Sequence, residues 1–125
     1  SRGLGDVYKR QFIAGVDIAD ALMRSINSGV VGEAYHFSPS RFFTIRQVIE
    51  IICSRMDIDF ADLVEISPDR PGKDQAYLMD SKKARRELGW QETLTFEEGV
   101  DDTIRWVKDS FDEISLLPLN YIHKI

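Results

Sequence analysis

Apolar residues recur with a helical period in three stretches of the chain. The first apolar face lies between Asp17 and Gly29 and consists of Ala19, Leu22, Met23 and Ile26. The second consists of Ile45, Val48, Ile49, Ile52 and Met56, and the third of Val100, Ile104, Val107 and Phe111. This spacing predicts three amphipathic helices, the first opened by Asp17 and ended by Gly29, each with one buried face.

Capping boxes precede the second and third of these faces. Thr44 with Gln47, and Thr95 with Glu98, have the sequence form in which a hydroxyl and a longer side chain satisfy two backbone N–H groups at a helix start. Thr44 could instead contact a ligand, but capping is sufficient to explain it. We therefore expect helices to begin directly after Thr44 and Thr95.

A shorter helix is expected after Asp80, with Gly89 supplying a left-handed end and Trp90 folding back onto the last turn. It carries four cations, namely Lys82, Lys83, Arg85 and Arg86. Because cations complement the dipole at a helix C-terminus, we favour that role over a basic binding patch. Trp90 and Trp106 are expected in the core.

Short apolar runs predict strands at residues 12–14, 34–37, 63–66 and 77–79. Strands that alternate with helices indicate the α/β class. Cys53 lies beside the apolar face of the second helix, and we expect it to be a small buried hydrophobe. The final stretch from Leu116 to Ile122 is too apolar to be solvated, so we expect it to dock on another surface.

Composition narrows the class of protein. The chain has 125 residues, of which 43% are hydrophobic, which is typical of one globular domain. Its formal charge of −5 provides no field to hold a nucleic-acid backbone, so we expect no nucleic-acid partner. One cysteine makes no intramolecular disulfide, and no apolar run approaches the roughly 20 residues that span a bilayer. We expect a cytoplasmic protein with no membrane partner.

The first eleven residues show no helical or strand period, and their composition differs from that of residues 12–125. We expect residues 1–11 to be a non-native leader and residues 12–125 to form the structural unit. Without the leader the chain has 13 basic and 20 acidic residues, and its formal charge becomes −7.

The loop from Asp69 to Asp74 is the best candidate for chemistry. Pro71 and Gly72 suit the central positions of a type II turn, which places Arg70 and Lys73 at its two ends. Two converging cations suit a diphosphate, because Arg offers a planar fork and Lys a movable point charge. A solvated turn whose charges are offset by Asp69 and Asp74 is the alternative. The sequence contains no Tyr-x-x-x-Lys and no glycine-rich phosphate loop.

Several ordered motifs resemble the C-terminal part of extended short-chain dehydrogenase/reductases that act on nucleotide sugars. They are Phe12-Ile13, Asp17-Ile18-Ala19, Gly32-Glu33-Ala34-Tyr35, the Asp69–Asp74 loop, Glu87-Leu88-Gly89-Trp90 and Phe96-Glu97-Glu98-Gly99-Val100. The resemblance covers residues 12–107, and the dTDP-glucose 4,6-dehydratase branch is the most similar in appearance. It implies an α/β substrate-binding lobe, made of helices with a few short strands, that follows a Rossmann domain holding NAD.

The resemblance also implies roles for particular residues. Asp69, Arg70, Gly72 and Lys73 would contact the diphosphate of a nucleotide-diphosphate sugar, with Arg70 as the main ligand. Thr44 stands where the family often has Asn, and Arg10 occupies the position of another phosphate-binding Arg. The family's catalytic Tyr and Lys have no counterpart in the chain, so we expect no activity from it alone, and we expect the parent protein to be a homodimer.

Two departures leave the activity open. Lys73 replaces a His of the dehydratases, and His36 stands where Asn is usual, so a 4-epimerase of the same family is an alternative to a 4,6-dehydratase. A non-catalytic interaction module, binding a protein through its apolar tail and strand edges, is the alternative from another class.

Overall fold

The computed structural model describes residues 8–65 and 76–118. Its strands are β1 (Lys9–Arg10), β2 (Phe43–Thr44) and β3 (Ala76–Tyr77), which form a sheet in the order β2-β1-β3. Its helices are α1 (Gly15–Ser28), α2 (Ile45–Met56), α3 (Phe60–Leu63), α4 (Lys82–Leu88), α5 (Phe96–Asp109) and α6 (Phe111–Ser115). The described residues are therefore rich in helix with a few short strands, as expected.

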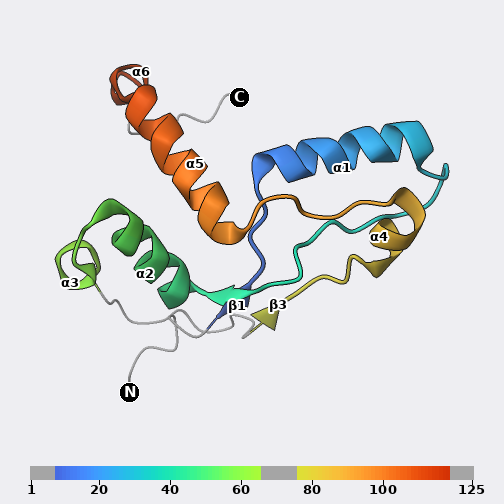
Figure 1. Cartoon of the computed structure of the whole chain (residues 1–125), viewed down its shortest axis with the longest axis horizontal. Coiled ribbons are helices and arrows are strands. Elements are labelled where there is room, and N and C mark those ends of the chain that lie inside the picture. Colours follow the sequence, from blue (N-terminus) through green and yellow to red (C-terminus); the bar gives the residue numbers. More distant parts are fainter. Residues whose placement is uncertain (1–7, 66–75, 119–125) are drawn as a thin grey trace.

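The small sheet separates two groups of helices (Figure 1). Helices α2, α3, α5 and α6 lie on one side of the sheet, and α2 packs against α5. Helices α1 and α4 lie together on the other side. Long extended segments connect the two groups, so the sheet is their common junction.

Both predicted capping boxes are confirmed. The Thr44 hydroxyl accepts the Gln47 N–H at 3.1 Å, and the Thr44 N–H donates to Gln47 Oε1 at 2.9 Å. Thr95 and Glu98 make the same reciprocal pair at the start of α5. Because each box satisfies N–H groups that a helix start leaves without partners, α2 and α5 begin where the sequence predicts.

The prediction that Asp17 caps α1 is wrong, because α1 begins two residues earlier, after Ala14. Asp17 is 1% exposed. Its carboxylate accepts hydrogen bonds from a segment far away in the sequence and does not cap the helix. Its Oδ1 accepts from the Thr93 N–H at 2.9 Å and from the Thr93 hydroxyl at 2.6 Å. The helix does end at Ser28, before Gly29, as expected.

The main hydrophobic core lies between α1 and α4. Ala21, Leu88 and Trp90 are buried together, with Tyr35 and Phe37 packed against them. Gly89 has a φ of 61°, so the left-handed end predicted for α4 is confirmed, and it turns the chain so that Trp90 enters the core. Trp90 Nε1 donates to the Asp17 carbonyl at 3.0 Å, which satisfies the only polar atom of the buried indole.

The other expected core aromatic residues are exposed. The third predicted helix is interrupted at Ser110, so α5 ends at Asp109 and a separate α6 begins at Phe111. This break changes the direction of the apolar face, and Phe111 is exposed. Trp106, expected in the core, is also exposed on α5. Cys53 is buried, as expected.

The predicted strands are mostly wrong. Residues 12–14 and 34–37 pair with no strand among the described residues. Of the run at 63–66, Leu63 ends the short helix α3, residues 64 and 65 form no strand, and Ile66 lies outside the described residues. The run at 77–79 overlaps β3 only at Tyr77. The Phe12 ring packs on Phe96 with centroids 5.6 Å apart, so its apolar surface is covered by a side chain rather than by a sheet face.

All four cations of α4 are paired, but only Arg85 and Arg86 lie in its last turn. The dipole role is wrong for Lys82 and Lys83, because α4 begins at Lys82. The partners of the four cations are Asp80 for Lys82, Glu33 for Lys83, Glu92 for Arg85 and Glu87 for Arg86. Ser81 is the N-cap residue, not Asp80, but the Asp80 carboxylate accepts the Lys82 N–H at 2.8 Å. Asp80 therefore satisfies one N–H group of the first turn from the preceding position.

A polar network joins α4 to residues 38–40. Arg85 donates to Glu92 Oε2 at 2.5 Å and to the Ser38 carbonyl at 3.1 Å. Glu92 Oε1 accepts from the Ser40 N–H at 2.8 Å, and the buried Ser81 hydroxyl donates to the Ser38 carbonyl at 2.9 Å. The network fixes the segment after β3 against the segment that precedes β2.

Replacing Asp17 by Ala should lower the free energy of unfolding by about 2–4 kcal/mol, because the Thr93 N–H loses its charged acceptor. Asp20→Ala is the matched control on the same helix. It removes a half-exposed ion pair to Arg24 and should cost less than about 1 kcal/mol. Urea unfolding of both variants measures the difference, and equal losses would contradict the role of Asp17.

Acid should weaken the network at Glu92. Burial raises the pKa of Glu92, but hydrogen bonds from Ser40 and Arg85 outweigh it and lower the pKa from 4.5 to about 2. The unfolded chain therefore binds the proton more readily, so this stabilisation is present above pH 4.5 and is lost as the pH falls toward 2.

The Glu92→Gln variant should consequently be less stable at pH 7 and lose less stability than the parent chain between pH 4.5 and 2. Urea unfolding at a series of pH values tests this. Gln91→Ala, a neutral and exposed neighbour, should keep the parent's acid profile. Parallel profiles for Glu92→Gln and the parent would show that Glu92 contributes no pH dependence.

Candidate functional site

The sheet brings two of the sequence-predicted residues, Arg10 and Thr44, onto neighbouring strands. β1 is the central strand, antiparallel to β2 and parallel to β3. Arg10 pairs with Phe43 on one side and with Tyr77 on the other. Directly paired residues share a face of a sheet, so the side chains of Arg10 and Tyr77 lie on the same face.

Two tyrosine rings hold the Arg10 side chain. Its guanidinium carbon lies 5.9 Å from the centroid of the Tyr8 ring and 5.8 Å from that of Tyr77. One guanidinium nitrogen donates to the Lys9 carbonyl at 3.0 Å. Within residues 8–65 and 76–118 no carboxylate forms an ion pair with Arg10.

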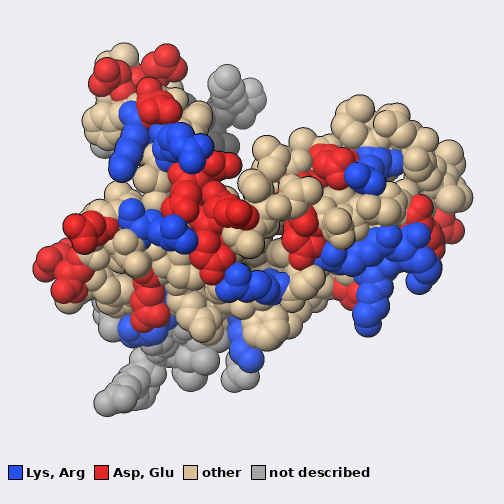
Figure 2. Space-filling model, in the orientation of Figure 1, with Lys and Arg blue, Asp and Glu red and all other residues tan. Residues whose placement is uncertain are grey.

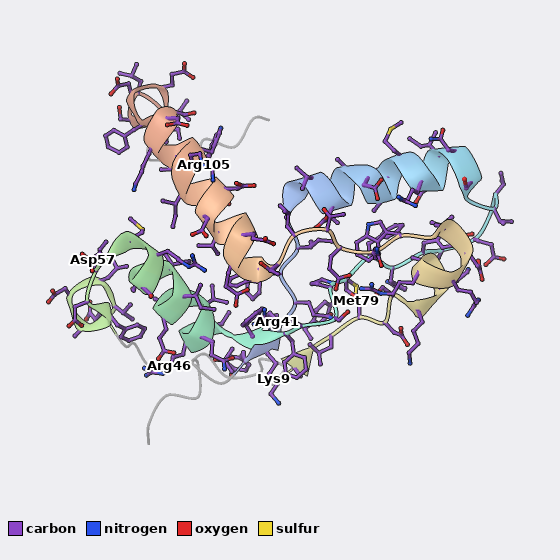
Figure 3. The ribbon with its side chains drawn as sticks, viewed as in Figure 1. Lys9, Arg41, Arg46, Asp57, Met79 and Arg105 are labelled. Carbon is purple, nitrogen blue, oxygen red and sulfur yellow. The ribbon has the colours of Figure 1, made fainter. Side chains whose placement is uncertain are left out.

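Thr44 lies on the opposite face of the sheet from Arg10. It pairs with Lys9, whose ammonium lies 5.2 Å from the centroid of the Phe42 ring (Figure 3). The Thr44 hydroxyl oxygen and N–H are both used in the capping box of α2. The capping role is therefore confirmed, whereas contact between Thr44 and a ligand stays a prediction.

Asp69, Arg70, Gly72 and Lys73 lie outside the described residues. The described chain resumes at Ala76, the first residue of β3, which pairs with Lys9. The candidate loop therefore comes just before β3 in the sequence, and β3 is the strand that pairs with β1 beside Arg10.

Gln11 has a structural role that the sequence did not indicate. Its Oε1 accepts the Met79 N–H at 2.8 Å, and its Nε2 donates to the Pro39 carbonyl at 2.8 Å. The side-chain amide thus continues the pairing of β1 with the residues after β3. Hydrophobic periodicity identifies no such residue, because a single Gln after a two-residue strand belongs to no repeating pattern. The non-native origin expected for residues 1–11 stays a prediction, although residues 8–11 contact the rest of the chain.

An apolar groove of about 710 Å³ runs between α2 and α5. We call it the α2–α5 groove; its helical walls include Val48, Ile52, Met56, Val100, Ile104 and Val107. Phe43 and Phe96, with ring centroids 4.5 Å apart, line the end nearest the sheet. Polar side chains also line the groove, and one of them, Arg41, donates a hydrogen bond to Glu97 Oε2 at 3.0 Å. Such a surface suits apolar contact rather than acid–base chemistry.

Basic side chains are concentrated on one helix in the view of Figure 2. Figure 2 shows Lys and Arg gathered over α4, whereas α5 carries Asp and Glu together with Arg105 and Lys108. The hydrogen bond from Arg41 lowers the pKa of the Glu97 carboxyl, and the Thr95 N–H lowers that of Glu98. In the part of the chain that the structure describes, no group of three or more His, Cys, Asp or Glu side chains forms a metal site, and no helix is long and apolar enough to cross a membrane.

Residues 3–103 match the family model described as GDP-mannose 4,6 dehydratase. Among curated relatives, dTDP-glucose 4,6-dehydratase of Neisseria gonorrhoeae is 35% identical over 104 residues, which cover 75% of this chain and 30% of the relative. The Escherichia coli dTDP-glucose 4,6-dehydratase is 34% identical over 100 residues, covering 72% of this chain and 28% of that protein. The chain thus spans less than a third of the length of these relatives.

Solved structures give the same fold. DesIV, a dTDP-glucose 4,6-dehydratase from Streptomyces venezuelae solved with NAD and TYD, superposes with a TM-score of 0.79 at 26% identity. The match covers 86% of this chain and 33% of DesIV. WbmF from Bordetella bronchiseptica, solved with NAD+ and UDP, gives a TM-score of 0.72 at 26% identity, covering 92% of this chain and 33% of WbmF. The chain therefore belongs to the GDP-mannose 4,6 dehydratase family, within the extended short-chain dehydrogenase/reductases.

Proposed function

We propose that this chain is the substrate-binding portion of an NAD-dependent nucleotide-sugar 4,6-dehydratase, with a nucleotide-diphosphate sugar as its ligand. The observation that carries the proposal is the position of Arg10 on the central strand, between two tyrosine rings and beside the strand that comes after residues 69–74. The names of the relatives, dTDP-glucose 4,6-dehydratases, supply the reaction class. No observation on this chain favours a 4-epimerase over a dehydratase.

Chain connectivity supports a contribution from the loop. Lys73 precedes Ala76 by three residues, so its Cα lies within about 11 Å of the Ala76 Cα even if the chain is fully extended. Ala76 in turn begins the strand that pairs with β1. In the proposal, Arg70 and Lys73 bind the diphosphate together with Arg10, and the loop residues Asp69 and Gly72 shape the turn. Thr44, on the other face of the sheet, would contribute indirectly, by fixing the start of α2.

The chemistry assigned to this chain is binding and orientation. Cations that hold the diphosphate fix the remote part of the ligand, and that binding energy is used to position the sugar ring for reaction. NAD, when bound to the parent protein, would supply the hydride transfer at the sugar. The eight glycines of this sequence form no glycine-rich phosphate loop, so its residues do not fit the dinucleotide, and no step is assigned through NAD here.

Three further expectations stay predictions. The parent protein is proposed to be a homodimer in the cytoplasm, and no nucleic acid is expected as a partner. The formal charge of −5 supports the last of these, since an acidic surface repels a phosphate backbone.

Substitution of the cations should weaken binding of a nucleoside diphosphate. With dTDP as the probe, Arg70→Ala and Arg10→Ala should each raise the Kd by about tenfold or more, because each removes a charged hydrogen bond to phosphate. Isothermal titration calorimetry measures the effect. Arg105→Ala is the control, because Arg105 lies on α5, far from the sheet, and pairs with Asp102 (Figure 3).

The control should leave the Kd unchanged. Unchanged binding in both Arg70→Ala and Arg10→Ala would contradict the proposed site. A loss in Arg70→Ala alone would place the phosphate on the loop without Arg10.

The chain by itself should form no 4-keto sugar from a dTDP-sugar and NAD+. None of its four tyrosines is followed four residues later by lysine, so the family's acid–base pair has no counterpart here. Carbon NMR of the sugar after long incubation is the measurement. Turnover by the purified chain would refute the assignment of a binding role alone.

A further inference from the structure

The two tyrosine rings beside Arg10 differ in how the fold uses them. Tyr8 is 8% exposed and belongs to the buried interior, whereas Tyr77 on β3 is 62% exposed. In the described part of the chain the Tyr77 hydroxyl forms no hydrogen bond. The ring of Tyr77 does have a defined contact, because the guanidinium carbon of Arg10 lies 5.8 Å from its centroid. Tyr77 is therefore the outer of the two aromatic contacts of Arg10.

The backbone of β3 fixes the place of the Tyr77 ring. Tyr77 pairs directly with Arg10 in the parallel ladder between β1 and β3. Two residues later, the Met79 N–H donates to Gln11 Oε1 at 2.8 Å, and the Met79 carbonyl accepts the hydroxyl of the buried Ser38 at 2.8 Å. Because both backbone groups of Met79 are bonded, the strand resists a shift of register. The ring thus stays beside Arg10 although little of it is buried.

An aromatic contact suits a phosphate-binding arginine better than an ion pair does. The attraction between a guanidinium and a ring uses none of the N–H groups as hydrogen-bond donors. A carboxylate partner would accept from these donors and compete with a phosphate. One nitrogen of Arg10 already donates to the Lys9 carbonyl at 3.0 Å. The rings can therefore set the direction of the other donors without occupying them.

The Tyr77 ring also lowers the entropic cost of binding through Arg10. Arginine is among the side chains that lose most rotamer freedom when they are fixed. Contacts with two rings restrict the Arg10 side chain before a ligand arrives, so less of that freedom is lost on binding. Loss of the outer ring would remove one of these two contacts and release the guanidinium toward solvent.

We propose that Tyr77 is a positioning residue for the diphosphate of the ligand, because its ring holds the Arg10 guanidinium in the orientation that binds phosphate. The inference rests on the proposed function, since it requires that Arg10 contact the diphosphate. Tyr77 itself touches no phosphate and acts through Arg10. The ring of Tyr77, and not its hydroxyl, performs this role.

Calorimetric titration of the 125-residue chain with dTDP tests the proposal. Tyr77→Leu keeps an apolar side chain but removes the ring, and it should raise the Kd about three- to fivefold, the size of an exposed cation–π contact. Tyr77→Phe keeps the ring and should have the Kd of the parent chain. Because position 77 is exposed, both variants should unfold at the urea concentration that unfolds the parent chain.

The double variant of Arg10→Ala with Tyr77→Leu separates positioning from an independent effect. If Tyr77 acts through Arg10, the second substitution should add nothing to the loss that the first one causes. Losses that multiply would overturn the proposal. Phe42→Ala is the matched control, because the Phe42 ring makes the same kind of contact with Lys9, at 5.2 Å, and its loss should leave the Kd unchanged.

The outcomes distinguish this inference from the proposed function. A raised Kd in Arg10→Ala with an unchanged Kd in Tyr77→Leu would overturn the role of Tyr77 and leave the proposed site intact. An equal loss in Tyr77→Phe and Tyr77→Leu would also overturn it, because the hydroxyl would then be the active part. An unchanged Kd in Arg10→Ala would remove Arg10 from the site, and the role of Tyr77 with it.

Discussion

The buried carboxylate of Asp17 is the interaction on which the arrangement of the two helix groups depends. It is nearly inaccessible to solvent, and it accepts from Thr93 while the Asp17 carbonyl accepts the Trp90 indole N–H. A buried charge is tolerated only when its acceptor sites are filled, so the segment from Trp90 to Thr93 can lie in few other places. Helix α5 starts shortly after that segment. The contact between Asp17 of α1 and this segment therefore sets the direction in which α5 begins.

Local chemistry explains which parts of the fold were predictable. The capping boxes at Thr44 and Thr95 and the left-handed Gly89 involve residues three or four positions apart, so their patterns are complete in the sequence. Asp17 resembles a helix cap in the same way, but its real partner is 76 positions away. The strand predictions failed for a similar reason. A two-residue strand is too short to show a period, and its pairing depends on segments far along the chain.

The same distinction between local and long-range interactions explains which residues of the candidate site were predictable. The resemblance pointed to Arg10, and the structure shows its guanidinium held by Tyr8 and Tyr77, a juxtaposition that exists only once β1 and β3 pair. Thr44 was correctly explained by capping, because that role is local. Gln11 was missed because its amide substitutes for backbone pairing, and a single Gln carries no pattern. The residues of the loop at 69–73 stay a prediction.

The position of β1 in the sheet ties ligand binding to folding. This strand is the first in the described chain, yet its parallel partner β3 is 67 residues later, with residues 66–75 in the connection that leads into β3. Pairings of such high sequence separation form late and cost loop-closure entropy. A diphosphate bound by Arg10 and by that connection would bridge both sides of this pairing. By mass action it would then favour the closed sheet, so that the unfolding equilibrium of the lobe would depend on the concentration of its ligand.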